Sequence, residues 1–235
     1  MQSIAAVLFD VGGPLDTEII YERLIDEHIR EALAAEGIAV SPDAYAEANR
    51  AAVNTFAPNA YAAIIWTLSR ADAGRSRRVY GRVAERADER HAARGGFELR
   101  PGIPDLLERL QRRGVPLGLV ANQPADAVDR MESAGIARYF THRDVSGTHG
   151  FRKPDVRVFL QASDALAAPP EKCVVVGDRI DNDVAPARAL GMRTVLFRTG
   201  RHREQQPRWW DECPDAEVTA VEGLERALVE LLSGA

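Results

Sequence analysis

The first apolar run of the chain ends in the segment Phe9-Asp10-Val11-Gly12-Gly13-Pro14-Leu15-Asp16. The run Ile4–Phe9 has the length and composition of a buried strand, so Asp10 is expected at the carboxyl end of that strand. Two glycines and a proline then allow the chain to turn sharply. Because reactive groups of open parallel sheets gather beyond the carboxyl ends of the strands, Asp10 is a candidate functional residue.

Short apolar runs alternate with helical stretches along the chain. This alternation is typical of an α/β fold in which crossover helices connect the strands of a parallel sheet. The predicted strands are Ile4–Phe9, Pro116–Val120, Lys172–Val176, Met192–Phe197 and Glu217–Thr219.

A long insertion separates the first two predicted strands. Its apolar residues recur at spacings of three and four, the period of an amphipathic helix. Ser41-Pro42-Asp43 predicts a helix start, with serine as N-cap and proline in the first turn, and Gly37 is expected to end the preceding helix. We predict a helical domain at 17–95, set into a core of 1–16 and 96–235 after a break at Gly95-Gly96.

Polar segments accompany the other strand ends and helix starts. They are Ala121-Asn122-Gln123-Pro124, Lys153-Pro154-Asp155 and Gly177-Asp178-Arg179-Ile180-Asp181-Asn182-Asp183. Together with Asp10, these segments in this order resemble the haloacid dehalogenase-like superfamily, in its branch with a helical cap inserted after the first strand. The resemblance covers nearly the whole chain and implies a Rossmann-like parallel sheet core with an inserted all-helical cap domain.

The resemblance also implies roles for individual residues. Asp10 matches the nucleophile, which attacks phosphorus and forms an aspartyl-phosphate that water then hydrolyses. Lys153 matches the lysine that offsets charge on the phosphoryl group and the nucleophile. Asp10, the backbone carbonyl of Gly12, Asp178 and Asp183 match the ligands of Mg²⁺. The residues agree with this, because three carboxylates at one sheet edge would repel one another strongly without a cation, and oxygen ligands suit a hard ion.

Two positions depart from the family pattern. Gly12 stands where an aspartate commonly protonates the leaving oxygen and later activates water, and Ala121 stands where a serine or threonine binds phosphate. Asn122 remains beside it and could direct its amide at the phosphate. Gly13, Ala121, Asn122 and Lys153 are therefore the predicted substrate-binding positions.

Three function classes follow from these residues. The first is a Mg²⁺-dependent phosphatase that acts on a small phosphorylated metabolite, and the second is a binding or regulatory protein with little turnover. The third is a haloacid dehalogenase, although the intact pair Asp178 and Asp183 argues against that metal-free branch. Loss of a general acid costs about two to four orders of magnitude in rate, but less with a good leaving group. Substitute acids named by sequence proximity are Asp16, Glu18, His28 and His149.

Charge, apolar content and cysteine count indicate which classes of partner and which cellular location to expect. The net charge of −5 argues against a nucleic-acid partner. The longest apolar runs are too short to span a bilayer, and the N-terminus lacks an export segment, so we expect no membrane association and a cytoplasmic location. Cys173 and Cys213 are too few for a disulfide framework. A monomer or a homodimer is expected.

The cap is expected to determine the substrate, because its closure would exclude water and supply contacts beyond the phosphate. Residues that could face the cleft are Tyr21, Arg23, His28, Arg50, Tyr61 and Trp66. Gly200–Pro214, with Trp209 and Trp210, is predicted to be an irregular loop that covers the core or contacts a partner.

Overall fold

A computed structural model describes residues 4–94 and 96–233, so Gly95 of the predicted break lies outside the described residues. The strands are β1 (Ala6–Phe9), β2 (Leu117–Leu119), β3 (Cys173–Gly177), β4 (Arg193–Phe197) and β5 (Ala216–Val218). The helices are α1 (Ile19–Ala35), α2 (Pro42–Asn54), α3 (Ala60–Leu68), α4 (Ala73–Glu85), α5 (Ala87–Arg94), α6 (Ile103–Arg112), α7 (Ala127–Ser133), α8 (Ser146–His149), α9 (Arg157–Ala165), α10 (Ala185–Ala189) and α11 (Val221–Ser233). Short helical turns are η1 (Ala137–Tyr139), η2 (Pro170–Lys172), η3 (Ile180–Val184) and η4 (Trp210–Glu212).

The five strands form one parallel sheet in the order β2-β1-β3-β4-β5. Each predicted strand is confirmed, with ends that differ by a few residues. Strand β1 lies between β2 and β3, and its last residue, Phe9, pairs with Leu119 on one side and Val176 on the other. The chain segments that follow β1, β2 and β3 therefore leave the sheet at the same edge.

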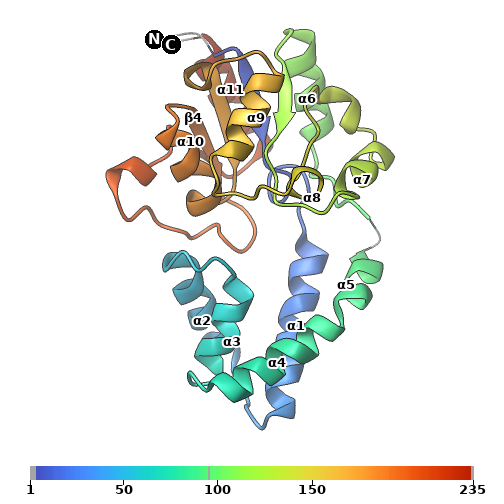
Figure 1. The fold of residues 1–235 in the computed structure, drawn as a ribbon, viewed down its shortest axis with the longest axis vertical. Helices are drawn as coiled ribbons and strands as arrows, with labels where there is room; N and C mark the ends of the chain where they lie inside the picture. The colour runs from blue at the N-terminus through green and yellow to red at the C-terminus, as the bar shows by residue number, and fades with distance from the viewer. Residues whose placement is uncertain (1–3, 95, 234–235) are drawn as a thin grey trace. The chain divides into compact units, whose positions relative to one another are not determined.

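Helices cover both faces of the sheet (Figure 1). Val7 and Phe9 of β1 pack in one cluster with apolar residues of α6 and α11. Ala6 and Leu8 point to the opposite face and pack with residues of α9 and α10. Because both faces are buried, β1 needs apolar residues at every position, which explains its continuous apolar run.

The inserted segment is helical, as the period of its apolar residues predicted. Ser41 is the N-cap of α2, and its hydroxyl accepts a hydrogen bond from the Ala44 N–H at 3.2 Å. Gly37 follows the end of α1 with φ +75°, a left-handed conformation that glycine adopts at little cost. Helices α1 to α4 enclose an apolar core of their own that includes Ile29, Ile64 and Val79.

The chain divides into two compact units. One consists of Met1–Thr17, Phe97–Arg203 and Pro207–Ala235, and the other of Glu18–Gly96 with Glu204–Gln206. We call them the α/β unit and the helical unit. Within the long irregular segment, Trp209 and Trp210 are 68% and 81% exposed, so these two side chains do not cover the core.

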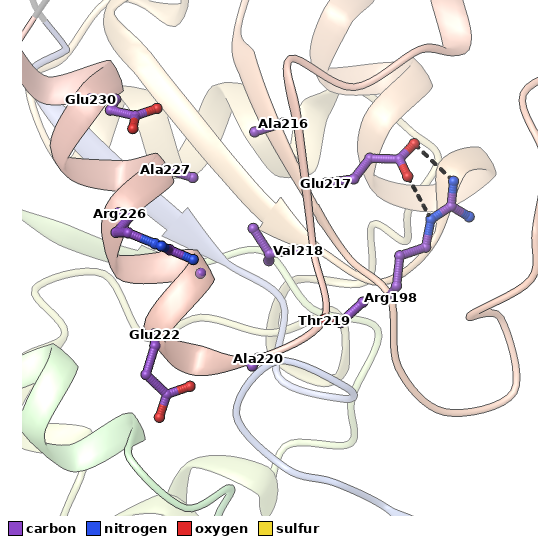
Figure 2. A pocket seen from close by; sticks show the side chains of 11 residues that line it. Arg198, Ala216, Glu217, Val218, Thr219, Ala220, Glu222, Arg226, Ala227 and Glu230 are labelled. Carbon is purple, nitrogen blue, oxygen red and sulfur yellow. Dashed lines mark hydrogen bonds and ion pairs between the residues drawn. The ribbon is translucent and has the colours of Figure 1, made fainter.

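A hollow of ≈ 750 Å³ lies at the outer edge of the sheet, between β5 and α11 (Figure 2). Arg198 and Glu217 form an ion pair on its rim at 2.8 Å, and Arg226 lies between Glu222 and Glu230 along α11. Its lining includes none of the predicted catalytic residues. Among the described residues, no helix is long and apolar enough to cross a membrane.

Candidate active site

Asp10 directly follows strand β1 at the carboxyl edge of the sheet. Its backbone N–H donates to the Val176 carbonyl at 2.8 Å, which continues the ladder between β1 and β3 by one residue. One carboxylate oxygen, Oδ1, accepts from the Val11 N–H at 2.7 Å, and the other, Oδ2, lies 2.8 Å from Lys153 Nζ. The backbone N–H of Val11 and the ammonium of Lys153 thus hold the Asp10 carboxylate in one orientation.

The turn after Asp10 depends on Gly13. This residue has φ +84°, and a Cβ atom placed on it would lie 2.7 Å from Cγ of Asp178. Glycine is therefore required both for the backbone conformation and for the close approach of Asp178. The Gly13 N–H donates to the Asp16 carbonyl at 2.7 Å, and the Gly13 carbonyl accepts from Arg100 at 2.6 and 2.9 Å.

Arg100 is a structural contributor that sequence reasoning missed. Its guanidinium donates to Gly13 O and, at 2.8 Å, to Thr199 Oγ1, which joins the loop after β1 to the segment after β4. Burial lowers its pKa, against the opposing effect of nearby Asp178 and Asp16. Nothing in the residues around position 100 signals this contact, because it joins segments far apart in the chain.

Lys153 is almost fully buried between two carboxylates. Its side chain is 1% exposed, and Nζ lies 2.8 Å from Asp10 Oδ2 and 2.5 Å from Asp183 Oδ1. Burial alone would lower the pKa of this ammonium, but the charges of Asp10 and Asp183 outweigh it and the pKa is raised. Lys153 is therefore a permanent positive charge at the centre of the site.

Asn122 binds the main chain of Lys153. Its Oδ1 accepts from the Lys153 N–H at 2.8 Å and its Nδ2 donates to the Lys153 carbonyl at 3.0 Å. The side chain thus clamps the main chain that carries the lysine, and both its oxygen and its nitrogen are engaged there. Ala121 is buried, and its carbonyl accepts from the Ser146 N–H at 3.0 Å.

The structure brings Asp10, Asp178 and Asp183 together. Each offers a carboxylate oxygen, and these oxygens all lie within 4.8 Å of one another. Burial raises the pKa of Asp178 well above its ordinary value, and the charges of Asp10 and Asp183 add to this effect. Burial likewise raises the pKa of Asp183 to about 6, although Lys153 opposes it. One lysine does not compensate three carboxylates, so the cluster fits a divalent cation with hard oxygen ligands.

Local backbone explains how the acidic cluster forms. A Cβ atom on Gly177 would lie 2.2 Å from Cγ of Asp183, so glycine at the end of β3 makes room for that carboxylate. The other oxygen of Asp183 accepts from the Arg179 N–H at 3.0 Å. Gly12, the fourth predicted ligand, is half-buried and bridges to Asp16 in the same turn.

The four candidate substitute acids lie in different surroundings. Asp16 is fully buried, accepts from the Glu98 N–H at 3.2 Å and lies 3.7 Å from Arg130, so it fastens the loop. Nδ1 of His149 accepts from the Phe151 N–H at 3.1 Å. Glu18 and His28 belong to the helical unit.

His202 interacts electrostatically with Arg179 and Asp181, and sequence reasoning did not single it out. Burial lowers its pKa to about 3, and the charge of Arg179 acts in the same direction while Asp181 opposes it. Burial therefore favours the neutral imidazole in the neighbourhood of Arg179 and Asp181.

The profile of the haloacid dehalogenase-like hydrolases matches residues 4–191. The chain belongs to this family. It is 34% identical over 119 residues to the glyceraldehyde 3-phosphate phosphatase of Methanopyrus kandleri, which is 50% of this chain and 51% of that protein. It is 34% identical over 138 residues to the phosphoserine phosphatase of Thermus thermophilus, 58% of this chain and 54% of that protein. The chain thus spans about half the length of the curated relatives it matches.

A solved haloacid dehalogenase-like phosphatase from Thermococcus onnurineus has the same fold. The two chains superpose with a TM-score of 0.59 at 23% identity, over 96% of this chain and 98% of the other. The predicted family and fold class are therefore confirmed. The roles of the individual site residues, including Gly12 and Ala121, stay predictions.

We predict that Mg²⁺ stabilises the α/β unit of this family member. A ligand at about 100 times its Kd stabilises by about 2.7 kcal/mol, and each kcal/mol shifts Tm by about 2–4 °C in a chain of this size. Calorimetry of metal-free protein should therefore show a saturable rise in Tm of several degrees. Asp178→Asn should remove the rise in Tm with Mg²⁺. It should not lower the metal-free Tm, because it relieves the repulsion among the three carboxylates. Asp129→Asn, at an exposed position of α7, should keep the rise in Tm. A wild-type Tm that is independent of Mg²⁺ would contradict the metal assignment.

We also predict that Asn122 positions Lys153. Asn122→Ala should lower the free energy of unfolding by about 1–3 kcal/mol, since it leaves two main-chain groups of Lys153 without partners. Urea-induced unfolding measures this cost. Asn122→Asp keeps the acceptor for the Lys153 N–H and should cost less. Equal stability of the alanine variant and the wild type would show that the clamp is dispensable.

Proposed function

We propose that the protein is a Mg²⁺-dependent phosphatase that hydrolyses a small phosphorylated metabolite through an aspartyl-phosphate intermediate. The observation that carries this proposal is the placement of Lys153 Nζ within 2.8 Å of Asp10 Oδ2 and 2.5 Å of Asp183 Oδ1, beside Asp178. A nucleophilic carboxylate, a fixed positive charge and a set of metal ligands thus share one sheet edge.

The chemistry follows from these groups. A carboxylate oxygen of Asp10 forms a bond to phosphorus while the bond between phosphorus and the leaving oxygen breaks. Water then attacks phosphorus and releases inorganic phosphate and the Asp10 carboxylate. Lys153 offsets negative charge on the nucleophile and on the phosphoryl oxygens. A bound Mg²⁺, held by Asp10, Asp178, Asp183 and the carbonyl of Gly12, would supply further neutralisation of the phosphoryl charge.

The range of substrates depends on whether the protein can donate a proton to the leaving oxygen. Glycine at position 12 has no side chain to protonate the leaving oxygen, and Asp16 is fastened by Glu98 and Arg130. We therefore infer a substrate whose leaving group departs without much proton donation, such as an acyl phosphate, an anhydride or a sugar 1-phosphate.

The names of the relatives support a small substrate. Glyceraldehyde 3-phosphate and phosphoserine, after which two relatives are named, are both small phosphate monoesters. The acidic cluster supports phosphoryl transfer over carbon–halogen hydrolysis, because halide release by a carboxylate nucleophile gains nothing from three carboxylates gathered for a cation.

Turnover of acetyl phosphate or an aryl phosphate tests the proposal. The wild type should hydrolyse these substrates with Mg²⁺ and lose the activity with a chelator, and Asp10→Asn should bring it to background with the fold intact by circular dichroism. Asp126→Asn, on the exposed start of α7, should keep full activity. Mg²⁺ binding with no turnover across a broad panel of phosphorylated metabolites would favour a binding or regulatory protein. Chloride release from a 2-haloacid in the presence of a chelator would favour a dehalogenase.

A second prediction concerns the missing acid. Gly12 is not among the residues with positive φ, so no left-handed backbone conformation opposes an aspartate there. In Gly12→Asp we expect turnover of alkyl phosphates to rise by up to about two to four orders of magnitude, with a smaller change for aryl phosphates. A plot of log kcat/KM against leaving-group pKa measures this, and its slope should be steep in the wild type and shallow in the variant. Gly12→Ala is the matched control. Identical slopes for Gly12→Asp and Gly12→Ala would refute the role of this position.

A further inference from the structure

The helical unit contains a cavity that is separate from the acidic cluster. It has a volume of ≈ 280 Å³ and lies among α1, α3, α4 and α5. Every residue that lines it falls between Tyr21 and Arg90, within the helical unit. Ile25, Ile65 and Val83 give it apolar walls, and Tyr21, Tyr61 and Tyr80 add aromatic surface.

Arg90 is the one cation of this lining. The residue is 3% exposed. Its Nη1 donates to the Val83 carbonyl at 2.7 Å and lies 3.0 Å from Nδ1 of His28. Burial, together with the charges of Arg86 and Arg90, lowers the pKa of His28, so the ring is neutral and Nδ1 can accept from Arg90. The positive charge therefore meets a carbonyl and a neutral imidazole.

The guanidinium carbon of Arg90 also lies 6.0 Å from the centroid of the Tyr21 ring, but one donor of this guanidinium has no acceptor in the described part of the chain. Its Nε is buried and has no hydrogen-bond partner among the described residues. Across residues 4–94 and 96–233, no carboxylate lies within ion-pair distance of this guanidinium. At longer range the charge of Arg90 contributes to lowering the pKa of Glu89. A buried donor without an acceptor is unfavourable, and a bound anion would supply both the acceptor and a close counter-charge.

The cavity is open to a ligand on one side. Asn59, Tyr80 and Ala84 line it and are exposed, whereas Ile65, Val83 and Arg90 line it and are buried. We take the side with the exposed residues as the mouth and the side with the buried residues, which include Arg90, as the floor. A ligand that enters from the mouth could thus place its charged group near Arg90 and its apolar body against the tyrosines.

We propose that this cavity binds a small organic carboxylate with an apolar or aromatic body. The guanidinium pairs well with a carboxylate, which accepts the Nε–H and balances the buried charge. A free inorganic dianion suits the site less, because its strong hydration would be lost against apolar walls without a second cation. This site goes beyond the proposed phosphatase reaction and is independent of the metal ligands.

Calorimetric titration with benzoate tests the proposal on the metal-free 235-residue chain. We expect saturable binding to the wild type and to Asp10→Asn alike, since neither Mg²⁺ nor turnover is needed. Benzamide, a neutral analogue of the same shape, should bind about ten- to a hundred-fold more weakly, as should benzoate to Arg90→Met, because a charge-assisted hydrogen bond is lost. Arg77→Met, which removes an exposed arginine of α4, should bind as the wild type does.

A second pair of variants tests the cavity without touching Arg90. Ala84→Trp fills the mouth and should abolish benzoate binding, whereas Ala34→Trp on the exposed side of α1 should not. Absence of saturable benzoate binding to wild-type protein overturns the proposal, as does equal affinity for benzoate and benzamide. Both results are independent of phosphatase activity, so failure of one proposal leaves the other standing.

Discussion

The ammonium of Lys153 between the carboxylates of Asp10 and Asp183 is the interaction on which the site depends. Three acidic side chains meet at the carboxyl edge of β1 and β3, where burial penalises every charge. A fixed cation at 2.8 and 2.5 Å from two of them makes that arrangement tolerable. Asn122 holds the main chain of the lysine from the end of β2, so neighbouring strands cooperate to place one charge.

Glycines let the carboxylates come this close. At positions 13 and 177 a Cβ atom would collide with Asp178 and Asp183, respectively. The same residue type has the opposite consequence at position 12, where the absence of a side chain removes the expected proton donor. In the proposed reaction, the loop after β1 thus combines a nucleophile with a dependence on the chemistry of the leaving group.

Much of the fold was predictable from the chain alone. The continuous apolar run of β1 indicated a strand buried on both faces, and Ser41 and Gly37 marked helix ends through capping and left-handed backbone, which are local effects. The order of the strands was not predicted, since short parallel strands carry no pairing signal in their sequence. The contact of Asn122 with Lys153 was not predicted, because the two residues are 31 positions apart. Arg100 was missed for the same reason, with its partner Gly13 87 positions away.

The sequence by itself determined the kind of protein: an α/β core, an inserted helical segment, and an aspartate, a lysine and an acidic pair in the order of one family. These features are local patterns, and their order along the chain needs no coordinates to be recognised. Only the tertiary structure decided which polar groups already have hydrogen-bond partners within the protein. It showed Asn122 bound to Lys153, Asp16 hydrogen-bonded to the main chain and the Nε of Arg90 buried without an acceptor among the described residues. Hydrogen bonds and burial arise between segments distant in sequence, so their partners appear only when the chain is folded.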